Sequence, residues 1–311
     1  TFWRAQIGYW AMKEEAAYQM IDLLVVPITE NTTKAMADCF DFFTDIDVFR
    51  FGIPHRKSER AFKYYLDGIK LLKEKLEELT GNKITEDKLR EAIDLCNKER
   101  EALREISLMR KTEGPPISGK DFVKLNHACF TADKSFMVKM LQSYCEELKV
   151  KERPRKEPRI LLTGSSLAAG DYKVLDVVEE TGAEVVIEEF GEGIRQYWET
   201  AEPDGDLMEA LADKYFKRRV GGAYFRPGRE RLDFIVKLAK DFNVDGVIWY
   251  QLPYRHGWSY QEVYFPDILK RETGLSMLQL ESDYDAMEIV PMRTRIETFV
   301  EVCRSQKSER S

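Results

Sequence analysis

The most chemically varied stretch of the sequence is "VIWYQLPYRHGWSYQEVYFP", which runs from Val247 to Pro266. It begins as an apolar run typical of a buried strand and ends in a pattern typical of a helix. Between them lies "YRHGW", residues 254–258, with a phenol, a guanidinium, an imidazole and an indole. Phenol and imidazole groups can transfer protons, and a guanidinium can bind an anion. A histidine in a loop is more often structural than catalytic, but His256 follows a strand, where sites commonly lie. A structural role and a catalytic role for His256 therefore both stay open.

Three further loops follow predicted strands: Pro27–Thr33, Ser165–Gly170 and Gly191–Trp198. The carboxyl ends of parallel strands meet at one edge of a sheet, so these loops and the "YRHGW" loop are expected to converge. The first, "TENTT", is typical of a helix N-cap cluster. The second, "TGSS", indicates either a tight strand-to-helix turn or a group of N–H groups and hydroxyls that binds a carbonyl or phosphate oxygen.

The third loop contains Arg195, for which two roles are open. Its guanidinium could bind an anionic ligand, or it could pair with neighbouring acidic side chains. Pairing is the safer expectation, because the acidic residues are close in sequence: Glu188, Glu189 and Glu192.

Several common site patterns are absent from the sequence. "GSSLAAGD" lacks the lysine of a phosphate-binding P-loop, and "GEGIRQYW" lacks the third glycine of a dinucleotide-binding turn. There is no HExxH pair, no nucleophile elbow and no paired Cys/His metal spacing. The cysteines form no CxxC pair and fall mostly within helical patterns, which is typical of small buried side chains in a reducing, cytosolic protein. They are Cys39, Cys96, Cys129, Cys145 and Cys303.

The elements that must position these loops alternate along the chain. In the first half, residues 2–20 are predicted to be helical, and two strands follow at 21–27 and 47–54. The first strand is a continuous apolar run, so we expect it to be buried on both faces. Two long helices come next. One covers Ser58–Leu79 and ends at Gly81, and the other starts from Thr85 as its N-cap. Residues 121–150 are also predicted to be helical.

The second half predicts four strands, "RILLTGS", "AEVVIEE", "VDGVIWYQ" and "LSMLQLES", separated by helices. This alternation favours a parallel sheet with helices on both faces. We predict helices near residues 172–181, 206–218, 229–242, 261–273 and 293–303. The charged, proline-bearing linker Lys149–Arg159 is the predicted domain boundary. The expected fold class is therefore α/β, with two Rossmann/flavodoxin-like parallel-sheet domains, residues 1–150 and 151–311, and a long inserted helical hairpin.

Composition excludes some classes of function. The net charge of −7 argues against a general nucleic-acid-binding protein. No apolar run is long enough to span a bilayer, and the charged residues near the start argue against a signal peptide. The chain starts at Thr1, which leaves open whether the N-terminal domain is truncated.

The whole chain resembles the 2-hydroxyacyl-CoA dehydratase and benzoyl-CoA reductase subunit family, including the D-component of 2-hydroxyglutaryl-CoA dehydratase. The resemblance is carried by "IDLLVVPITENTTKAMADCF", by "LKEKLEELTGNKITEDKLREAIDLCNKERE" with the following "PPISG", and by "RILLTGSSLAAGDYKVLDVVEETGAEVV". It continues in "EEFGEGIRQYWE" and in the stretch from Val244 to Tyr284, which ends in Glu-x-Asp-Tyr.

This resemblance implies a paired subunit of an enzyme that contains [4Fe-4S] clusters. A separate ATP-hydrolysing iron–sulfur activator donates one electron at low potential, the substrate is a CoA thioester, and a ketyl radical follows. The outcome in such enzymes is either dehydration of a 2-hydroxyacyl-CoA or reduction of an aromatic acyl-CoA ring. The resemblance does not distinguish between the two.

The sequence departs from its relatives at the cluster ligands. The cysteines of cluster-binding subunits align near Asn31, Gly191 and the Leu252–Tyr254 segment, around Pro253, and none of these residues is cysteine. Cluster ligation needs sulfur donors. We therefore expect no cofactor-binding or metal-binding residue in this chain, and we expect the [4Fe-4S] cluster on a homologous partner subunit.

Within an enzyme subunit, Tyr254 or His256 would donate a proton to the reduced substrate. Ser165 and Ser166 would hold the thioester carbonyl or a phosphate. Further substrate contacts would come from Arg195, Arg255 and Trp258. The alternatives are a structural or regulatory paralogue that completes a dimer interface, or a cluster-free acyl-CoA-binding protein.

Overall fold

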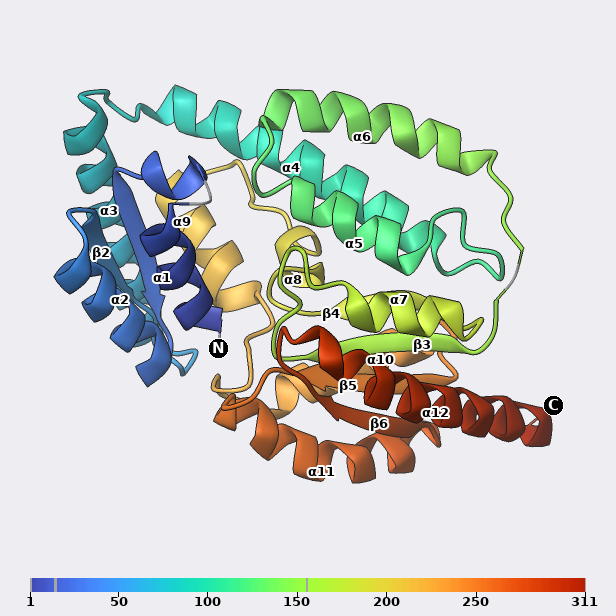
Figure 1. Cartoon of the computed structure of the whole chain (residues 1–311). Coiled ribbons are helices and arrows are strands. Elements are labelled where there is room, and N and C mark those ends of the chain that lie inside the picture. Colours follow the sequence, from blue (N-terminus) through green and yellow to red (C-terminus); the bar gives the residue numbers. More distant parts are fainter. Residues whose placement is uncertain (1, 14–15, 155, 311) are drawn as a thin grey trace. The chain divides into compact units, whose positions relative to one another are not determined.

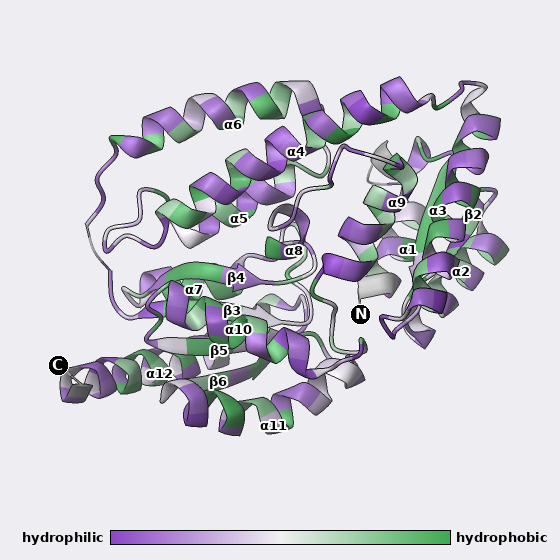
Figure 2. Ribbon diagram, turned by 180° about the vertical axis from the view of Figure 1, so that it is seen from behind, coloured by the Kyte–Doolittle hydropathy of each residue, from purple (hydrophilic) through white to green (hydrophobic). Residues whose placement is uncertain are grey.

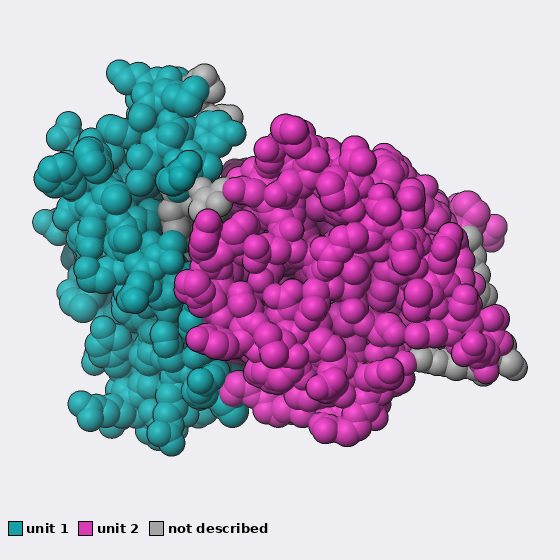
Figure 3. All heavy atoms as spheres, turned by 60° about the horizontal axis from the view of Figure 1, so that its bottom comes forward, with its two compact units in different colours: residues 1–90, 202–218, 224–227 teal, residues 91–201, 219–223, 228–311 magenta. Residues whose placement is uncertain are grey.

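The computed structural model describes residues 2–13, 16–154 and 156–310. These residues form two compact units (Figure 3). Unit 1 comprises residues 1–90, 202–218 and 224–227, and unit 2 comprises residues 91–201, 219–223 and 228–311. The division differs from the boundary predicted at Lys149–Arg159, because the helices just before this linker belong to the same unit as the second sheet.

Unit 1 contains a two-stranded parallel sheet with helices around it (Figure 1). Its elements are α1 (Phe2–Met12), a 3-10 turn (Ala16–Gln19), β1 (Leu23–Ile28), α2 (Asn31–Phe43), β2 (Asp47–Gly52), α3 (Glu59–Thr80), α9 (Leu207–Ala212) and a π-helical turn (Asp213–Arg218). Helix α4 (Glu86–Met109) begins in unit 1 and continues in unit 2. The predicted helix over residues 2–20 is shorter than expected, since α1 ends at Met12, and residues 14–15 lie outside the described residues.

The prediction that the first strand is buried on both faces is wrong for β1. Val26 is fully buried, but the neighbouring Val25 on the opposite face is 38% exposed. The buried face packs against α2, and Phe40 is one of its contacts in that core. The long hairpin helix α3 ends at its predicted cap, Gly81, and begins one residue later than predicted, because Ser58 is its N-cap. Ser58 Oγ accepts from the N–H of Ala61, and Gly81 ends the helix with a left-handed backbone conformation.

Unit 2 contains a four-stranded parallel sheet in the order β4-β3-β5-β6. Its strands are β3 (Arg159–Gly164), β4 (Glu184–Glu189), β5 (Gly246–Gln251) and β6 (Ser276–Glu281). Its other elements are α5 (Gly119–Ala128), α6 (Lys134–Lys149), α7 (Lys173–Glu180), α8 (Ile194–Tyr197), α10 (Arg229–Asp241), α11 (His256–Thr273), a 3-10 turn (Ala286–Glu288) and α12 (Ile289–Arg310). The α/β class and the four strands predicted in this half are confirmed. This strand order is that of a doubly wound, flavodoxin-like sheet.

The core of unit 2 lies on both faces of this sheet. Every residue of β3, β4 and β5 is buried, whereas β6 is a partly exposed edge strand. Alternate residues of the central strands, such as Ile160 and Ile248, pack in one cluster with Val174 of α7 and Ile296 of α12. On the opposite face, Trp249 packs against Phe265 of α11, with ring centroids 6.0 Å apart. The strands of this sheet carry mainly hydrophobic residues, and its helices alternate hydrophobic and hydrophilic ones (Figure 2).

Helix α5 covers the outer edge of β4, which explains why it belongs to unit 2. The N–H of Gly119 donates to the carboxylate of Glu184 at 3.3 Å. A Cβ atom at residue 119 would lie only 2.4 Å from the carbonyl oxygen of Val185, so the helix approaches the strand through a glycine.

Helix α11 begins at His256, earlier than predicted, and continues through Pro266. A proline inside a helix removes the hydrogen bond to the carbonyl four residues earlier. Here Gln279 of β6 supplies the missing donor, since its Nε2 lies 2.6 Å from the carbonyl oxygen of Glu262. The neighbouring strand therefore allows one continuous helix. Among the helices of the described residues, none combines the length and the apolar character needed to cross a membrane.

Candidate functional site

The loops that follow the four strands of unit 2 are hydrogen-bonded to one another at the carboxyl edge of the sheet. The N–H of Leu167, after β3, donates to the carboxylate of Glu192, after β4. The N–H of Leu252, after β5, donates to Ser165 Oγ at 3.0 Å. Ser282, after β6, donates its N–H to the carbonyl oxygen at the end of β5 at 3.0 Å. The fourth loop expected at this edge, Pro27–Thr33, belongs to unit 1.

The end of β3 approaches β5 closely, and only glycine fits there. Gly164 has φ +144°, and a Cβ atom at this position would lie 1.7 Å from the carbonyl oxygen of Tyr250. The next residue, Ser165, is 4% exposed and uses its hydroxyl as an acceptor for Leu252. Ser165 thus joins two loops, while Ser166 is partly exposed beside it.

Arg195 pairs with Glu189, as the safer of the two expectations had it. Its Nε and Nη2 atoms lie 2.8 and 2.6 Å from Glu189 Oε1, and its side chain is 6% exposed. The other oxygen of Glu189 accepts from Arg231 of α10, at 2.7 and 3.0 Å. Burial alone would raise the pKa of the Glu189 carboxyl, but the two guanidinium groups outweigh burial and hold this pKa below its ordinary value.

The pKa of Glu192, in the loop after β4, is shifted in the opposite direction from that of Glu189. Burial raises the pKa of its carboxyl, although the Leu167 N–H and the more distant Arg195 and Arg255 act to lower it. A carboxyl with a raised pKa can hold a proton under milder conditions than an exposed one. Sequence reasoning treated Glu192 only as a partner for Arg195, because its contact with Leu167 spans two loops.

The residues predicted after β5 differ in exposure. Tyr254 is 78% exposed and has a positive φ of 65°, and His256 is an exposed residue at the first position of α11. Trp258 is buried on the first turn of that helix, with the guanidinium of Arg255 4.6 Å from the centre of its ring. The two predicted proton donors are thus accessible, while Trp258 supports the loop through packing.

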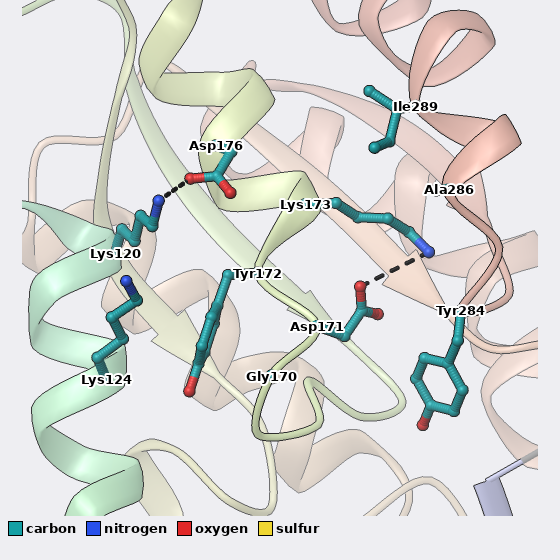
Figure 4. Close-up of a pocket in the computed structure, with 10 residues that line it drawn as sticks. All are labelled: Lys120, Lys124, Gly170, Asp171, Tyr172, Lys173, Asp176, Tyr284, Ala286 and Ile289. Atoms are coloured by element: carbon teal, nitrogen blue, oxygen red, sulfur yellow. Dashed lines mark ion pairs between the residues drawn. The ribbon is translucent and has the colours of Figure 1, made fainter. Parts of the chain in front are cut away.

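A cavity of about 340 Å³ opens beside these loops (Figure 4). It lies between α5, the start of α7 and the segment after β6. Asp171 connects it to the sheet, since it accepts a hydrogen bond from the hydroxyl of Tyr250 at 2.8 Å. Tyr284, after β6, also lines the cavity, and its electrostatic neighbours include Asp171, Glu192 and Arg255.

None of the predicted site residues lines this cavity, and sequence reasoning missed the residues that do. Tyr284 had a signal, because it ends the family-like Glu-x-Asp-Tyr stretch. Lys173 and Asp171 had none, since nothing local distinguishes them from other charged residues near a helix start. Their placement depends on how α7 and β5 pack.

The residues at the three aligned cluster positions do not fit an iron–sulfur cluster. Asn31 is the first residue of α2, and Gly191 and Pro253 lie in the loops after β4 and β5. None supplies sulfur, which cluster ligation requires. A Cβ atom at Gly191 would have only Arg195 Nη1 near it, at 3.9 Å, which is an ordinary contact distance. The fold therefore has room for a Cβ atom at this position, and crowding is not the reason for the glycine.

The cysteines lie away from these positions. Cys39, Cys96, Cys145 and Cys303 are on helices, and Cys129 is the residue that ends α5. Burial, with help from Glu99, raises the pKa of the Cys129 thiol to about 12, which leaves it an unreactive thiol. Within the described ranges no cysteine forms a disulfide, and no three His, Cys, Asp or Glu side chains are grouped to hold a metal ion.

Three known proteins are similar to this chain over much of its length. The putative dehydratase subunit YjiM of Escherichia coli (strain K12) is 28% identical over 287 residues, which are 90% of this chain and 74% of that protein. The (R)-phenyllactyl-CoA dehydratase beta subunit of Clostridium sporogenes is 24% identical over 91% of this chain and 76% of its own length. A benzoyl-CoA reductase subunit of Thauera aromatica is 23% identical over 64% of this chain and 53% of its own length.

The family model described as 2-hydroxyglutaryl-CoA dehydratase, D-component, matches residues 2–303, nearly the whole chain. Its match covers both compact units and all the strand-end loops described above. The chain therefore belongs to the 2-hydroxyglutaryl-CoA dehydratase D-component family.

Proposed function

We propose that this chain is a subunit of a hetero-oligomeric enzyme that acts on an acyl-CoA thioester, by dehydrating a 2-hydroxyacyl-CoA or by reducing an aromatic ring. Relatives named as subunits of a phenyllactyl-CoA dehydratase and a benzoyl-CoA reductase support this class. The observation that carries the proposal is the convergence of four strand-end loops of unit 2. One of these loops leads to the accessible Tyr254 and His256, and the loops after β3 and β6 contribute to the lining of a cavity.

In this proposal the [4Fe-4S] cluster belongs to a homologous partner subunit, and an ATP-hydrolysing iron–sulfur activator supplies the electron. The support is chemical, since Asn31, Gly191 and Pro253 offer no thiolate. The role of this chain would be to bind and orient the thioester and to deliver a proton from Tyr254 or His256. We place the complex in the cytoplasm, in keeping with the lack of disulfides among the described residues.

The test is anaerobic co-purification with iron and sulfide quantified per subunit. We expect the isolated chain to carry no iron and the complex with its partner to carry a cluster. About four irons per copy of the isolated chain would contradict the cluster assignment. Turnover of an acyl-CoA by the complete complex with its activator, lost when this chain is omitted, would support the enzymatic role.

A second candidate is a non-catalytic paralogue that completes the dimer interface. One observation favours it: Ser165 and Arg195, two predicted substrate-binding residues, already use their side chains for internal bonds. Expression of the chain alone distinguishes the two. If the isolated chain is monodisperse and binds a CoA ester tightly without a partner, the interface role fails and a cluster-free acyl-CoA-binding protein remains.

A further inference from the structure

The cavity beside α7 has a lining in which positive charge exceeds negative charge. It contains three lysines, Lys120, Lys124 and Lys173, and two aspartates, Asp171 and Asp176. Three positive charges against two negative ones leave an excess of one. Its volume of about 340 Å³ lies in the range of small-molecule sites.

Two of the lysines are neutralised within the cavity and one is not. Lys120 pairs with Asp176, and Lys173 lies 3.6 Å from Asp171 (Figure 4). Lys124 lies one helical turn beyond Lys120 on α5 and is exposed. Its ammonium group is 5.4 Å from the centre of the Tyr172 ring, and it makes no ion pair with any residue in the described parts of the chain.

The aromatic residues of the lining are held in place or left with an unused polar group. Tyr172 is hydrogen-bonded through its hydroxyl to His127 Nδ1 at 3.1 Å. Tyr284 has a buried hydroxyl oxygen with no hydrogen-bond partner among the described residues. This oxygen is buried in the protein and does not face the cavity, so Tyr284 contributes its ring rather than its hydroxyl to the lining. Tyrosine rings and a lysine ammonium together suit a ligand with a flat ring and an anionic group.

We propose that this cavity binds the phosphorylated nucleoside end of the substrate, with Lys124 as the charge that contacts a phosphate. The proposal rests on the proposed function for the identity of the ligand, since acyl-CoA carries a phosphorylated adenosine. The first turn of α7 supports it, because its N-cap residue Tyr172 makes no side-chain capping bond. The absence of Tyr254 and His256 from the lining fits a site for the non-reacting end of the thioester.

The first test is calorimetric titration of the full chain with adenosine 3′,5′-bisphosphate, adenosine and inorganic phosphate. We expect the bisphosphate to bind, Lys124→Ala to weaken its binding about tenfold, and added salt to weaken it further. Lys139→Ala, which removes an exposed lysine of α6, is the matched control and should bind as the unaltered chain does. Adenosine binding equal to that of the bisphosphate would overturn the phosphate contact, and inorganic phosphate binding equally well would overturn the role of the ring.

Two further measurements distinguish failure of the nucleotide site from failure of the proposed enzymatic function. Tyr284→Phe removes only the buried hydroxyl and keeps the ring that lines the cavity, so it should leave bisphosphate binding unchanged. In the complete complex, Lys124→Ala should raise KM about tenfold with kcat unchanged. The reason is that the phosphate contact binds the ground state and the transition state equally. If the complex turns over acyl-CoA and Lys124→Ala leaves KM unchanged, this inference fails while the proposed function stands. If bisphosphate binding depends on Lys124 but the complex does not turn over acyl-CoA, the inference stands and the proposed function fails.

Discussion

Arg195 holds the carboxylate of Glu189 through two hydrogen bonds, from Nε at 2.8 Å and from Nη2 at 2.6 Å. The second oxygen of this carboxylate is held by Arg231, whose guanidinium also contacts the hydroxyl of Thr163 at 3.0 Å. One buried acidic group thus connects the ends of β3 and β4 with α8 and α10. A residue suited to anion binding has a carboxylate of its own chain as partner.

Removal of Glu189 should cost more stability than removal of Arg195. Glu189→Gln leaves two buried guanidinium groups without their shared carboxylate, and we expect a loss of about 3–5 kcal/mol in the free energy of unfolding. Arg195→Met should cost less, because Arg231 still pairs with Glu189. Urea denaturation measures both. Arg293→Met is the control, since its ion pair with Glu180 is largely exposed and should contribute less than about 1 kcal/mol. Equal losses for Glu189→Gln and Arg293→Met would contradict the role of the buried cluster.

Glu189 and Glu192 should change the pH dependence of stability in opposite directions. The raised pKa of Glu192 stabilises the fold fully below its ordinary value of 4.5, and this stabilisation is lost as the pH rises through the raised value. The lowered pKa of Glu189 stabilises the fold above 4.5, and this stabilisation is lost as the pH falls through the lowered value.

Urea denaturation over a series of acidic and neutral pH values tests this pair. Relative to the unaltered chain, Glu192→Gln should become more stable as the pH rises. Glu189→Gln should recover relative stability as the pH falls below 4.5. For each variant, the difference in the free energy of unfolding from the unaltered chain is plotted against pH. Slopes of the same sign for the two variants would contradict the opposite pKa shifts of Glu189 and Glu192.

Ser165 should matter for stability and Ser166 should not. Ser165→Ala leaves the N–H of Leu252 buried without an acceptor, which costs about 1–3 kcal/mol. Ser166 is partly exposed, so Ser166→Ala should change stability by no more than about 0.5 kcal/mol. Thermal and urea denaturation of the two variants provide the comparison. If Ser165 binds substrate and has no structural role, Ser165→Ala will instead weaken substrate binding and leave stability unchanged.

Gly164 should be among the least tolerant positions of unit 2. Gly164→Ala places a Cβ atom 1.7 Å from the carbonyl oxygen of Tyr250, and β3 and β5 must separate to accept it. We expect a loss of about 4 kcal/mol or more. Gly182→Ala, after α7, also has a positive φ, but its Cβ would meet only the end of the Arg304 side chain at 3.4 Å. That control should cost about 1–2 kcal/mol, from backbone strain alone. Similar losses for the two variants would contradict the close approach of the strands.

Tyr254 and His256 should affect turnover more than stability, since both are exposed. If one of them is the proton donor, its variant, Tyr254→Phe or His256→Ala, should lower the kcat of the complete complex about 100-fold or more. Tyr260→Phe removes an exposed hydroxyl one turn further along α11 and is the control. Steady-state kinetics under anaerobic conditions are the measurement. Full turnover by the Tyr254→Phe, His256→Ala double variant would remove both residues from the mechanism.

Features that depend on neighbours along the chain follow from the amino-acid order alone. Apolar runs mark β3, β4 and β5, and the local capping residue Gly81 marks the end of α3. Parallel strands put their following loops at one edge, which is why the loops with Ser165, Arg195 and Tyr254 can be identified without a structure. The sequence also shows directly that residues 191 and 253 are not cysteines, while their comparison with cluster ligands rests on the resemblance to the family.

Which groups in these loops meet depends instead on the packing of distant elements. Glu189 and Arg231 are 42 positions apart, and no local pattern predicts that α10 brings that arginine to the end of β4. The same is true of Lys124, Asp171 and Tyr284, which meet at one cavity from three separate segments. Periodicity and capping report on a few neighbouring residues, whereas a buried ion pair or a cavity is formed by side chains from separate elements. That packing gave Arg195 and Ser165 partners within the fold and left Tyr254 and His256 exposed.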